Sequence, residues 1–95
     1  MKNIMMLRKR IDEIDEQILR SLKERLEVCQ TIGATKHQNH IPIRDYSREN
    51  EIYQQIMRKA TKLGLNAQQV KRIYQQIIAM CIYAQDRIPK TLEVE

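Results

Sequence analysis

The first third of the sequence carries one helical pattern that is too long to fit inside a compact domain. From about Asn3 to about His37, apolar side chains recur every three or four positions, as in a helix that buries one face. Gly33 weakens this pattern by only about 1 kcal/mol and need not end it. At about 1.5 Å per residue the helix is about 50 Å long, whereas a compact domain of this chain length has a radius of gyration of about 12–13 Å. The first apolar positions are Ile4, Leu7, Ile11, Ile14 and Ile18.

A second, shorter helix is predicted after a turn. The segment "NHIPIRD" ends the first pattern, because Pro42 disfavours helical geometry at the residue before it. The second helix is predicted over residues 46–63, with Asp45 or Ser47 as its N-cap. Gly64 is a good stop signal for that helix.

A third helix is predicted over residues 66–88. Asn66 is its N-cap, Gln69 stands three positions later as a capping-box partner, and Pro89 closes it. The remaining tail, "KTLEVE", is expected to be frayed.

These patterns predict an all-α fold with three helices and one domain over residues 1–95. The chain has two glycines, two prolines and no Phe or Trp, which leaves little material for strands and turns. Two short helices cannot cover the stripe of a first helix spanning 3–38. We therefore expect an intertwined homodimeric helical bundle, in which the long helix pairs with its copy. A monomer with a helical hairpin near Gly33 is the alternative.

Charge and cysteine content restrict the possible partners only loosely. The chain has 17 basic and 12 acidic residues, a net charge of +5, but the charges are mixed along the sequence as on a solvated surface. Cys29 and Cys81 lie among apolar residues and are interpreted as small buried hydrophobes in a reducing compartment, in preference to a disulfide. "MKNIMML" does not resemble a signal peptide, and no apolar run approaches about 18 residues, so a cytoplasmic location without membrane contact is expected.

Polar residues interrupt the apolar stripe of every predicted helix. Arg25 and Lys36 fall within about 20° of one face of the first helix and about 16 Å apart along its axis. Asp45, Arg48 and Glu49 share a face of the second helix and continue its stripe. Gln85 does the same on the third helix, one turn after Cys81.

Inward-facing charges on all three helices favour a ligand pocket. Buried charges are unfavourable unless they are paired or bound to a ligand. An internal salt bridge such as Arg25 with Glu49 is the simpler alternative for any one residue. For the whole set, a pocket with an excess of cations suits an anionic ligand, since Arg binds carboxylates in a bidentate fork.

Arg8 cannot join this pocket from the same helix. It lies about 25 Å and about 100° away from Arg25 on a regular helix. If two long helices pair antiparallel, Arg8 of one chain can reach the pocket that holds Arg25 of the other.

The sequence offers no nucleophile paired with a base, no Gly-rich phosphate loop and no metal-binding motif. His37 and His40 are spaced for metal binding, but they lie at a helix end without an adjacent acidic partner. We therefore expect no metal and no cofactor.

At this point the residues resemble the all-helical chorismate mutase family, most closely the free-standing mutases and the mutase domain of bifunctional mutase–dehydratases. The resemblance covers about Leu7 to Arg87. The matching strings are "LRKRIDEIDEQIL", "ERLEV", "GATK", "IPIRDYSREN" and "IYQQIIAMCIYAQ". The R-D-x-x-R-E string after a proline is the most specific of them.

The resemblance implies an intertwined dimer that rearranges chorismate to prephenate on the path to Phe and Tyr. It implies that Arg25 and the partner chain's Arg8 clamp the two substrate carboxylates, while Lys36 contacts a carboxylate and the ether oxygen. Gln85 would donate to the ether oxygen and Glu49 would hold the ring hydroxyl.

Three further positions complete the set of site residues that the resemblance implies. Asp45 would contribute through the loop backbone, and Arg48 would help to order the site. Cys81 stands where the family pattern has a serine near a substrate carboxylate, and a thiol is a weaker donor.

Other functions remain open at the level of sequence. An isochorismate pyruvate-lyase would share the fold and a pericyclic mechanism, although the intact "RDYSRE" string favours the mutase. A non-catalytic mutase-like regulatory module would not need every polar stripe residue. A nucleic-acid binder would carry its charges on one exposed face, whereas here the distinctive charges point inward.

Overall fold

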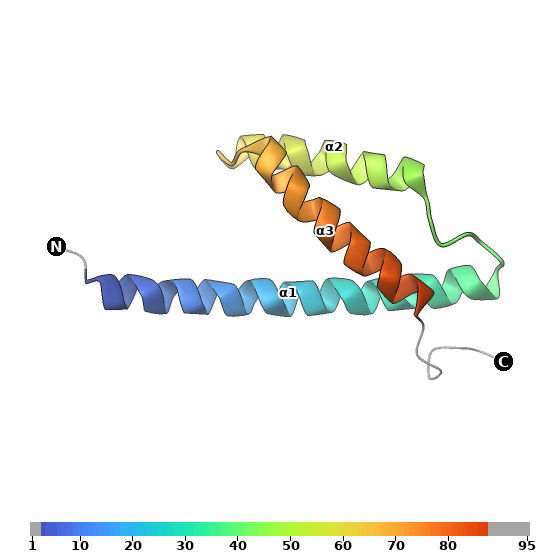
Figure 1. Ribbon diagram of the computed structural model, residues 1–95, viewed down its shortest axis with the longest axis horizontal. Helices are drawn as coiled ribbons and strands as arrows, with labels where there is room; N and C mark the ends of the chain where they lie inside the picture. The colour runs from blue at the N-terminus through green and yellow to red at the C-terminus, as the bar shows by residue number, and fades with distance from the viewer. Residues whose placement is uncertain (1–2, 88–95) are drawn as a thin grey trace.

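The computed structural model describes residues 3–87 and contains three helices, with no strand among those residues (Figure 1). They are α1 (Ile4–Gln38), α2 (Tyr46–Lys62) and α3 (Ala67–Asp86). This confirms the predicted all-α class and the three helical segments to within two residues at each end. Residue 88, Pro89 and the tail, which entered the prediction for the third helix, lie outside the described residues.

Side-chain caps fix where each helix begins. Asn3, Asp45 and Asn66 are the N-caps, and their side-chain oxygens accept from the backbone N–H of Met5, Arg48 and Gln69 at 2.8, 3.0 and 3.0 Å. Each bond satisfies one of the donors that a helix leaves unpaired at its start. Asp45, rather than Ser47, is therefore the cap of α2.

The end of α2 depends on a glycine. Gly64 has φ +76°, a left-handed conformation that glycine adopts without steric strain. Its N–H donates to the Thr61 carbonyl at 3.1 Å, and the Leu65 N–H reaches the Ala60 carbonyl at 2.9 Å. The predicted stop at Gly64 is thus confirmed, and the chain turns there into α3.

Helix α1 runs without interruption through Gly33, so the alternative of a hairpin at that glycine is wrong. Gly33 is buried where α3 crosses α1. A Cβ at this position would lie 2.5 Å from the Gln85 carbonyl oxygen and 2.6 Å from Gln85 Cα. Glycine is needed here to let two helix backbones approach closely, not to bend the chain.

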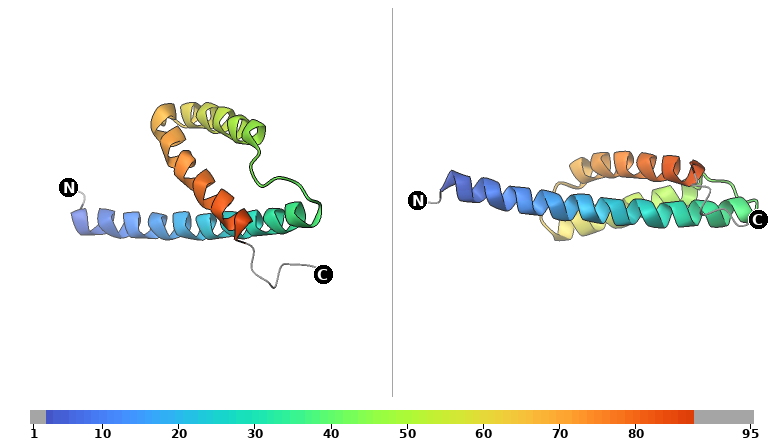
Figure 2. Two further views of the ribbon diagram at one scale, coloured as in Figure 1. Left: turned by 45° about the vertical axis from the view of Figure 1, so that its right-hand side comes forward. Right: turned by 90° about the horizontal axis from the view of Figure 1, so that it is seen from below.

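The three helices form an open layer rather than a closed bundle (Figures 1 and 2). Among the described residues, α3 packs against both α1 and α2, whereas α2 does not pack against α1. The chain measures 61 × 29 × 15 Å, and its radius of gyration of 16.9 Å exceeds the value of about 12–13 Å for a compact domain of this length. The buried hydrophobic residues are few: Cys29, Ala34, Ala60, Ile78 and Cys81.

The N-terminal half of α1 projects beyond the other two helices (Figure 1). Large apolar side chains along it are exposed, from 47% at Leu7 to 76% at Met5. They are Ile4, Met5, Met6, Leu7, Ile11, Ile18 and Leu19. Many exposed apolar side chains on one segment are typical of a protein interface.

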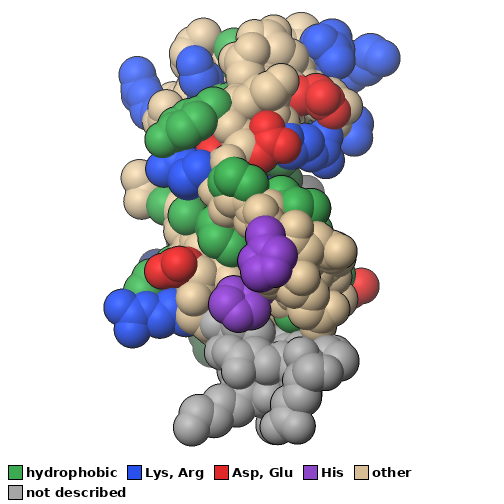
Figure 3. Space-filling view, turned by 90° about the vertical axis from the view of Figure 1, so that its right-hand side faces the viewer, with side chains coloured by type: hydrophobic (Ala, Val, Ile, Leu, Met, Phe, Trp, Pro, Cys, Tyr) green, Lys and Arg blue, Asp and Glu red, His purple; other side chains and the backbone are tan. Residues whose placement is uncertain are grey.

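The surface charges are mixed, as expected from the sequence. On the face in Figure 3, Lys and Arg side chains alternate with Asp and Glu around hydrophobic ones, without one continuous basic patch. None of the helices within residues 3–87 combines the length and the apolar composition needed to span a bilayer.

Candidate active site

All three helices and the loop before α2 line a cavity of about 440 Å³. Every site residue predicted from the sequence lines it except Arg8. The polar lining is Arg25, Lys36, Asp45, Arg48, Glu49 and Gln85, with both cysteines among the apolar lining. The apolar remainder is Val28, Ile32, Ile43, Ile52, Ile78 and Ile82.

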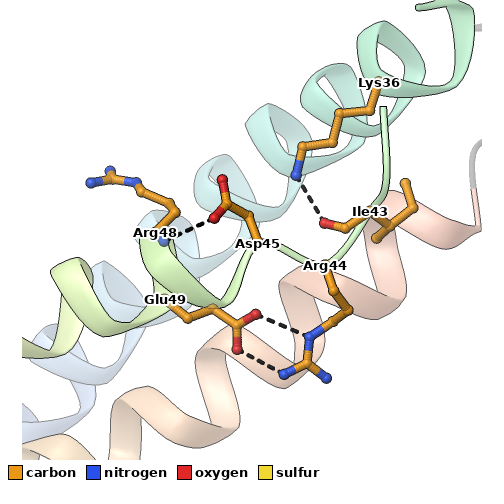
Figure 4. A network of polar contacts seen from close by, with 6 residues as sticks. All are labelled: Lys36, Ile43, Arg44, Asp45, Arg48 and Glu49. Carbon is orange, nitrogen blue, oxygen red and sulfur yellow. Dashed lines mark hydrogen bonds and ion pairs between the residues drawn. The ribbon is translucent and has the colours of Figure 1, made fainter. Parts of the chain in front are cut away.

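Helix α1 contributes two cations to the cavity. Lys36 is fixed by two hydrogen bonds, since its Nζ donates to the Ile43 carbonyl and to Gln85 Oε1, each at 2.9 Å (Figure 4 shows the first). Arg25 is half-buried, and its Nη1 contacts the Cys81 sulfur. Within residues 3–87, Arg25 pairs with no carboxylate, so the alternative of an Arg25–Glu49 salt bridge is wrong.

Glu49 is instead held by Arg44, which comes from the loop before α2 (Figure 4). Arg44 Nε and Nη2 donate to the two carboxylate oxygens at 3.0 and 2.9 Å, a bidentate geometry that fixes the carboxylate. Hydrogen bonding to Glu49 raises the pKa of Arg44, which stays charged. The Glu49 side chain is only 15% exposed, so it presents a fixed acceptor at the cavity wall.

Sequence reasoning missed Arg44. Its guanidinium lies over the Tyr46 ring, 4.4 Å from the centroid. From there it contacts Glu49, which lies five residues later in the first turn of α2. A helical face cannot indicate this pair, because Arg44 precedes the helix. The only signal in the sequence was the presence of two arginines, Arg44 and Arg48, in the segment "IRDYSRE" that also contains Glu49. Glu49 is the one carboxylate that lines the cavity from within α2.

The other charged groups of α2 are engaged near the surface. Asp45 is exposed and its carboxylate caps the helix, which fixes the turn that carries Glu49. Arg48 pairs with Glu51 at 2.6 Å, with both side chains more than half exposed. Exposed ion pairs of this kind contribute little to stability, so Arg48 can turn from Glu51 to a cavity ligand at small cost.

Gln85 forms the wall on α3, opposite Lys36. Its backbone is packed against Gly33, and its Oε1 accepts from Lys36 Nζ. An amide has two N–H donors and one oxygen. Because the oxygen faces Lys36, the NH₂ group is the part of Gln85 that is left to bind a ligand.

The charged groups around the cavity are not all compensated. Glu49 is compensated by Arg44, and Asp45 by the N-terminus of α2. Arg25 and Lys36 carry positive charges that no carboxylate within the described residues neutralises. Cationic and neutral donors thus face the cavity from α1 and α3, an arrangement that suits a small anion.

The two cysteines lie beside Arg25. Burial, followed by a hydrogen bond with Cys81, raises the pKa of Cys29 to about 12, against a smaller opposing effect of Arg25 and Lys36. Cys29 is therefore a neutral thiol at physiological pH. Both cysteines are free and buried, as the sequence predicted.

Arg8 does not reach this cavity. It is exposed near the start of α1, and the helix is continuous from there to Arg25, which separates the two residues by about 25 Å. The predicted role of Arg8 thus requires a second chain. No group of three or more His, Cys, Asp or Glu side chains suited to a metal occurs within residues 3–87.

The fold and the cavity define a small all-helical domain with one cavity lined by residues of all three helices. A family model described as chorismate mutase type II matches residues 7–86, nearly the whole of the described chain. The chain belongs to the chorismate mutase type II family.

Known relatives agree with this assignment. A protein of Methanocaldococcus jannaschii named chorismate mutase is 35% identical over 72 residues, covering 76% of this chain and 73% of the relative. The bifunctional chorismate mutase/prephenate dehydratase of Aquifex aeolicus is 38% identical over 91 residues, 93% of this chain and 25% of that protein. The chain thus spans about a quarter of the length of the bifunctional relatives it matches.

A solved structure shares the arrangement of helices. A conserved hypothetical protein from Pyrococcus furiosus superposes with a TM-score of 0.67 at 35% sequence identity, over 86% of this chain and 93% of that one.

Proposed function

We propose that this chain catalyses the rearrangement of chorismate to prephenate, a step toward Phe and Tyr. The observation that carries the proposal is the convergence of Arg25, Lys36 and Gln85 on one cavity. Within residues 3–87, no carboxylate forms an ion pair with Arg25 or Lys36. Relatives named chorismate mutase support the assignment of this substrate to the site.

The chemistry of the reaction matches what the cavity contains. A pericyclic rearrangement breaks a C–O bond and forms a C–C bond in one step, so it needs no nucleophile or proton transfer. It does need a flexible dicarboxylate held in a compact conformation, which lowers the entropic part of the barrier. It also benefits from fixed donors aimed at the ether oxygen, which gains negative charge as its bond breaks.

The residues divide between these two tasks. Arg25 binds one carboxylate with its guanidinium fork. Lys36 Nζ lies 2.9 Å from Gln85 Oε1. A ligand oxygen placed next to both side chains can therefore accept hydrogen bonds from the Lys36 ammonium and from the Gln85 NH₂ group. These donors are fixed by protein contacts before the ligand arrives, so little reorganisation is needed in the transition state.

The acidic wall has a different task. Glu49, held by Arg44, is a fixed acceptor suited to the ring hydroxyl of chorismate. Asp45 supports it through the first turn of α2, and Arg48 can leave Glu51 to supply a further cation. Cys81 occupies the wall beside Arg25 and offers only a weak thiol donor.

We further propose that the active form is an intertwined homodimer. The exposed apolar half of α1 supports this, because it offers a second copy of the helix a surface on which to pack. Antiparallel pairing would bring Arg8 of one chain to the cavity of the other, where it would bind the second carboxylate of the substrate.

The test is to incubate the purified chain separately with chorismate and with isochorismate and to identify the products. We expect prephenate from chorismate and no pyruvate release from isochorismate. Pyruvate as the main product would assign the site to a lyase. If a folded chain converts neither substrate, the proposal that this chain is an enzyme without a further partner is wrong.

A further inference from the structure

Cys29 on α1 and Cys81 on α3 bring two thiols together in the wall of the cavity. Both residues line it, and they are only 7% and 4% exposed. The Nη1 atom of Arg25 contacts the Cys81 sulfur and lies 4.0 Å from the Cys29 sulfur. Two residues far apart in sequence therefore have their sulfur atoms beside the same guanidinium nitrogen.

The backbones are also close at this point. Gly33 lies one helical turn after Cys29, and Gln85 lies one turn after Cys81. At that level the backbones are so near that a Cβ on Gly33 would be 2.6 Å from Gln85 Cα. Each cysteine lies one helical turn before the residue that makes this close approach, and a disulfide needs such closeness, with Cα atoms about 4.4–6.8 Å apart.

We propose that Cys29 and Cys81 form a redox modification site, which a low-molecular-weight disulfide converts to an intrachain disulfide that weakens anion binding at Arg25. The simpler interpretation, two small apolar residues filling a helix contact, accounts for their burial. It does not account for the position of both sulfur atoms beside the same nitrogen of Arg25 in the cavity wall.

The chemistry proceeds in two exchange steps. The Cys81 thiolate attacks a small disulfide RSSR, forming the Cys81–S–S–R bond, and RS⁻ leaves with the electron pair of the broken S–S bond. The Cys29 sulfur, after losing its proton to solvent, then attacks the Cys81 sulfur and expels a second RS⁻. Both RS⁻ groups take up protons as RSH. The protein loses two hydrogens overall, and RSSR is reduced to two RSH.

The surroundings favour this order. The Arg25 guanidinium contacts the Cys81 sulfur, whereas the Cys29 sulfur lies 4.0 Å from the same nitrogen. Cys29 begins as a neutral thiol, because burial and then Cys81 raise its pKa. Cys81 is therefore the first sulfur to react, and Cys29 resolves the mixed disulfide.

The product would alter the anion site directly. The Cys81 sulfur must turn from the Arg25 guanidinium toward Cys29 to make the bond. Arg25 would lose the contact that supports its side chain, and the weak thiol donor of Cys81 would disappear. This consequence for substrate rests on the proposed function, whereas formation of the disulfide does not.

The test exposes the folded, reduced full chain to bis(2-hydroxyethyl) disulfide, quenches with an alkylating agent under denaturing conditions and measures the intact mass. We expect the loss of two hydrogens, no retained adduct and no alkylation, with both thiols restored by dithiothreitol. A chain that keeps both thiols, carries an adduct on each cysteine, or forms a disulfide between chains would overturn the proposal.

Two single variants separate the roles of the sulfurs. Cys29→Ser should retain one mixed-disulfide adduct on Cys81, because no second sulfur can displace it. Cys81→Ser should be modified much more slowly, since Cys29 remains buried and protonated. The reverse pattern would refute the order of attack, and circular dichroism confirms that each variant is folded.

Turnover supplies a separate readout. We expect oxidation to raise the KM for chorismate several-fold and reduction by dithiothreitol to restore it. An oxidised chain with an unchanged KM would refute the effect on Arg25. If the reduced chain does not turn over chorismate, the proposed function fails, but the mass measurement still decides whether the disulfide forms.

Discussion

Gln85 shows how one residue can be fixed at both ends. Its backbone packs against Gly33, which sets its height on α1, and its side-chain oxygen accepts from Lys36 at 2.9 Å, which sets the orientation of the amide. The NH₂ group is then directed by the protein rather than by the ligand. Such preorganised donors give the largest benefit when charge develops during a reaction.

Replacing Gln85 with glutamate should make turnover depend on pH. A protonated carboxyl can still donate a hydrogen bond, whereas an ionised one pairs with Lys36 and has no donor. We expect Gln85→Glu to be active at low pH and to lose activity as the pH rises and the carboxyl ionises. The measurement is kcat/KM against pH for Gln85→Glu and the unmodified chain. A flat profile for the variant would argue against Gln85 as a donor.

At the residue scale, sequence reasoning found the side chains that periodicity can place. Arg25, Lys36, Glu49 and Gln85 all interrupt apolar stripes, and all of them line the cavity. Arg44 was missed because it acts from a loop, where no period applies. The alternative of an Arg25–Glu49 ion pair is wrong, because Arg44 holds Glu49, and helical periodicity gives no sign of that contact.

At the scale of elements, the first turn of α2 links stability to the site. Asp45 caps this turn, and Glu49 projects from it into the cavity. Asn66 caps α3 in the same way but does not line the cavity. The two caps therefore form a matched pair, one near the site and one remote from it.

Asp45→Ala and Asn66→Ala should each lower the free energy of unfolding by about 1 kcal/mol, the usual contribution of an N-cap. Only Asp45→Ala should also raise the KM for chorismate, because only that variant loosens the turn that holds Glu49. Chemical denaturation and steady-state kinetics on both variants check this. Equal effects on KM would show that α2 does not position the site.

Gly33→Ala should separate α3 from α1. In an open helix, Gly to Ala stabilises by about 1 kcal/mol. At Gly33 the new methyl group would overlap the Gln85 backbone, and overpacking of this kind costs about 1–3 kcal/mol. We expect a net loss of stability and of activity, measured by denaturation and kcat/KM. Thr31→Ala, an exposed site on the same helix, is the control that should change neither by much.

The helices themselves were predictable because their signals are local. Capping residues, Gly64 and Pro42 fixed the boundaries to within two residues wherever the structure describes them. The tight crossing at Gly33 was not predictable, because the sequence showed only a weak point in a helix. Whether a glycine bends a chain or admits a neighbour depends on what packs against it.

At the scale of the whole molecule, the packing of the long α1 is incomplete within one chain. Its apolar N-terminal half is exposed, and Arg8 lies there, remote from the cavity. The proposed dimer explains both observations with one contact, because the surface that binds the second chain also carries Arg8 to its site.

Mixing two inactive variants tests the shared site. Arg8→Ala and Lys36→Ala should each have low activity as homodimers. If each site takes Arg8 from one chain and Lys36 from the other, a heterodimer contains one intact site. Unfolding and refolding an equimolar mixture should then restore about a quarter of the unmodified activity, as statistical pairing of two subunits gives. No recovery would place Arg8 and Lys36 in the same site of one chain, or Arg8 outside the site.

The most direct test of the account is the initial rate of prephenate formation by the unmodified chain, by Lys36→Ala and by Lys59→Ala. Lys59 is an exposed lysine of α2 that does not line the cavity, so it controls for loss of charge. We expect kcat to fall by about 100- to 1000-fold in Lys36→Ala, as for the loss of one oxyanion donor, and to stay unchanged in Lys59→Ala. Near-normal turnover by a folded Lys36→Ala would contradict the account.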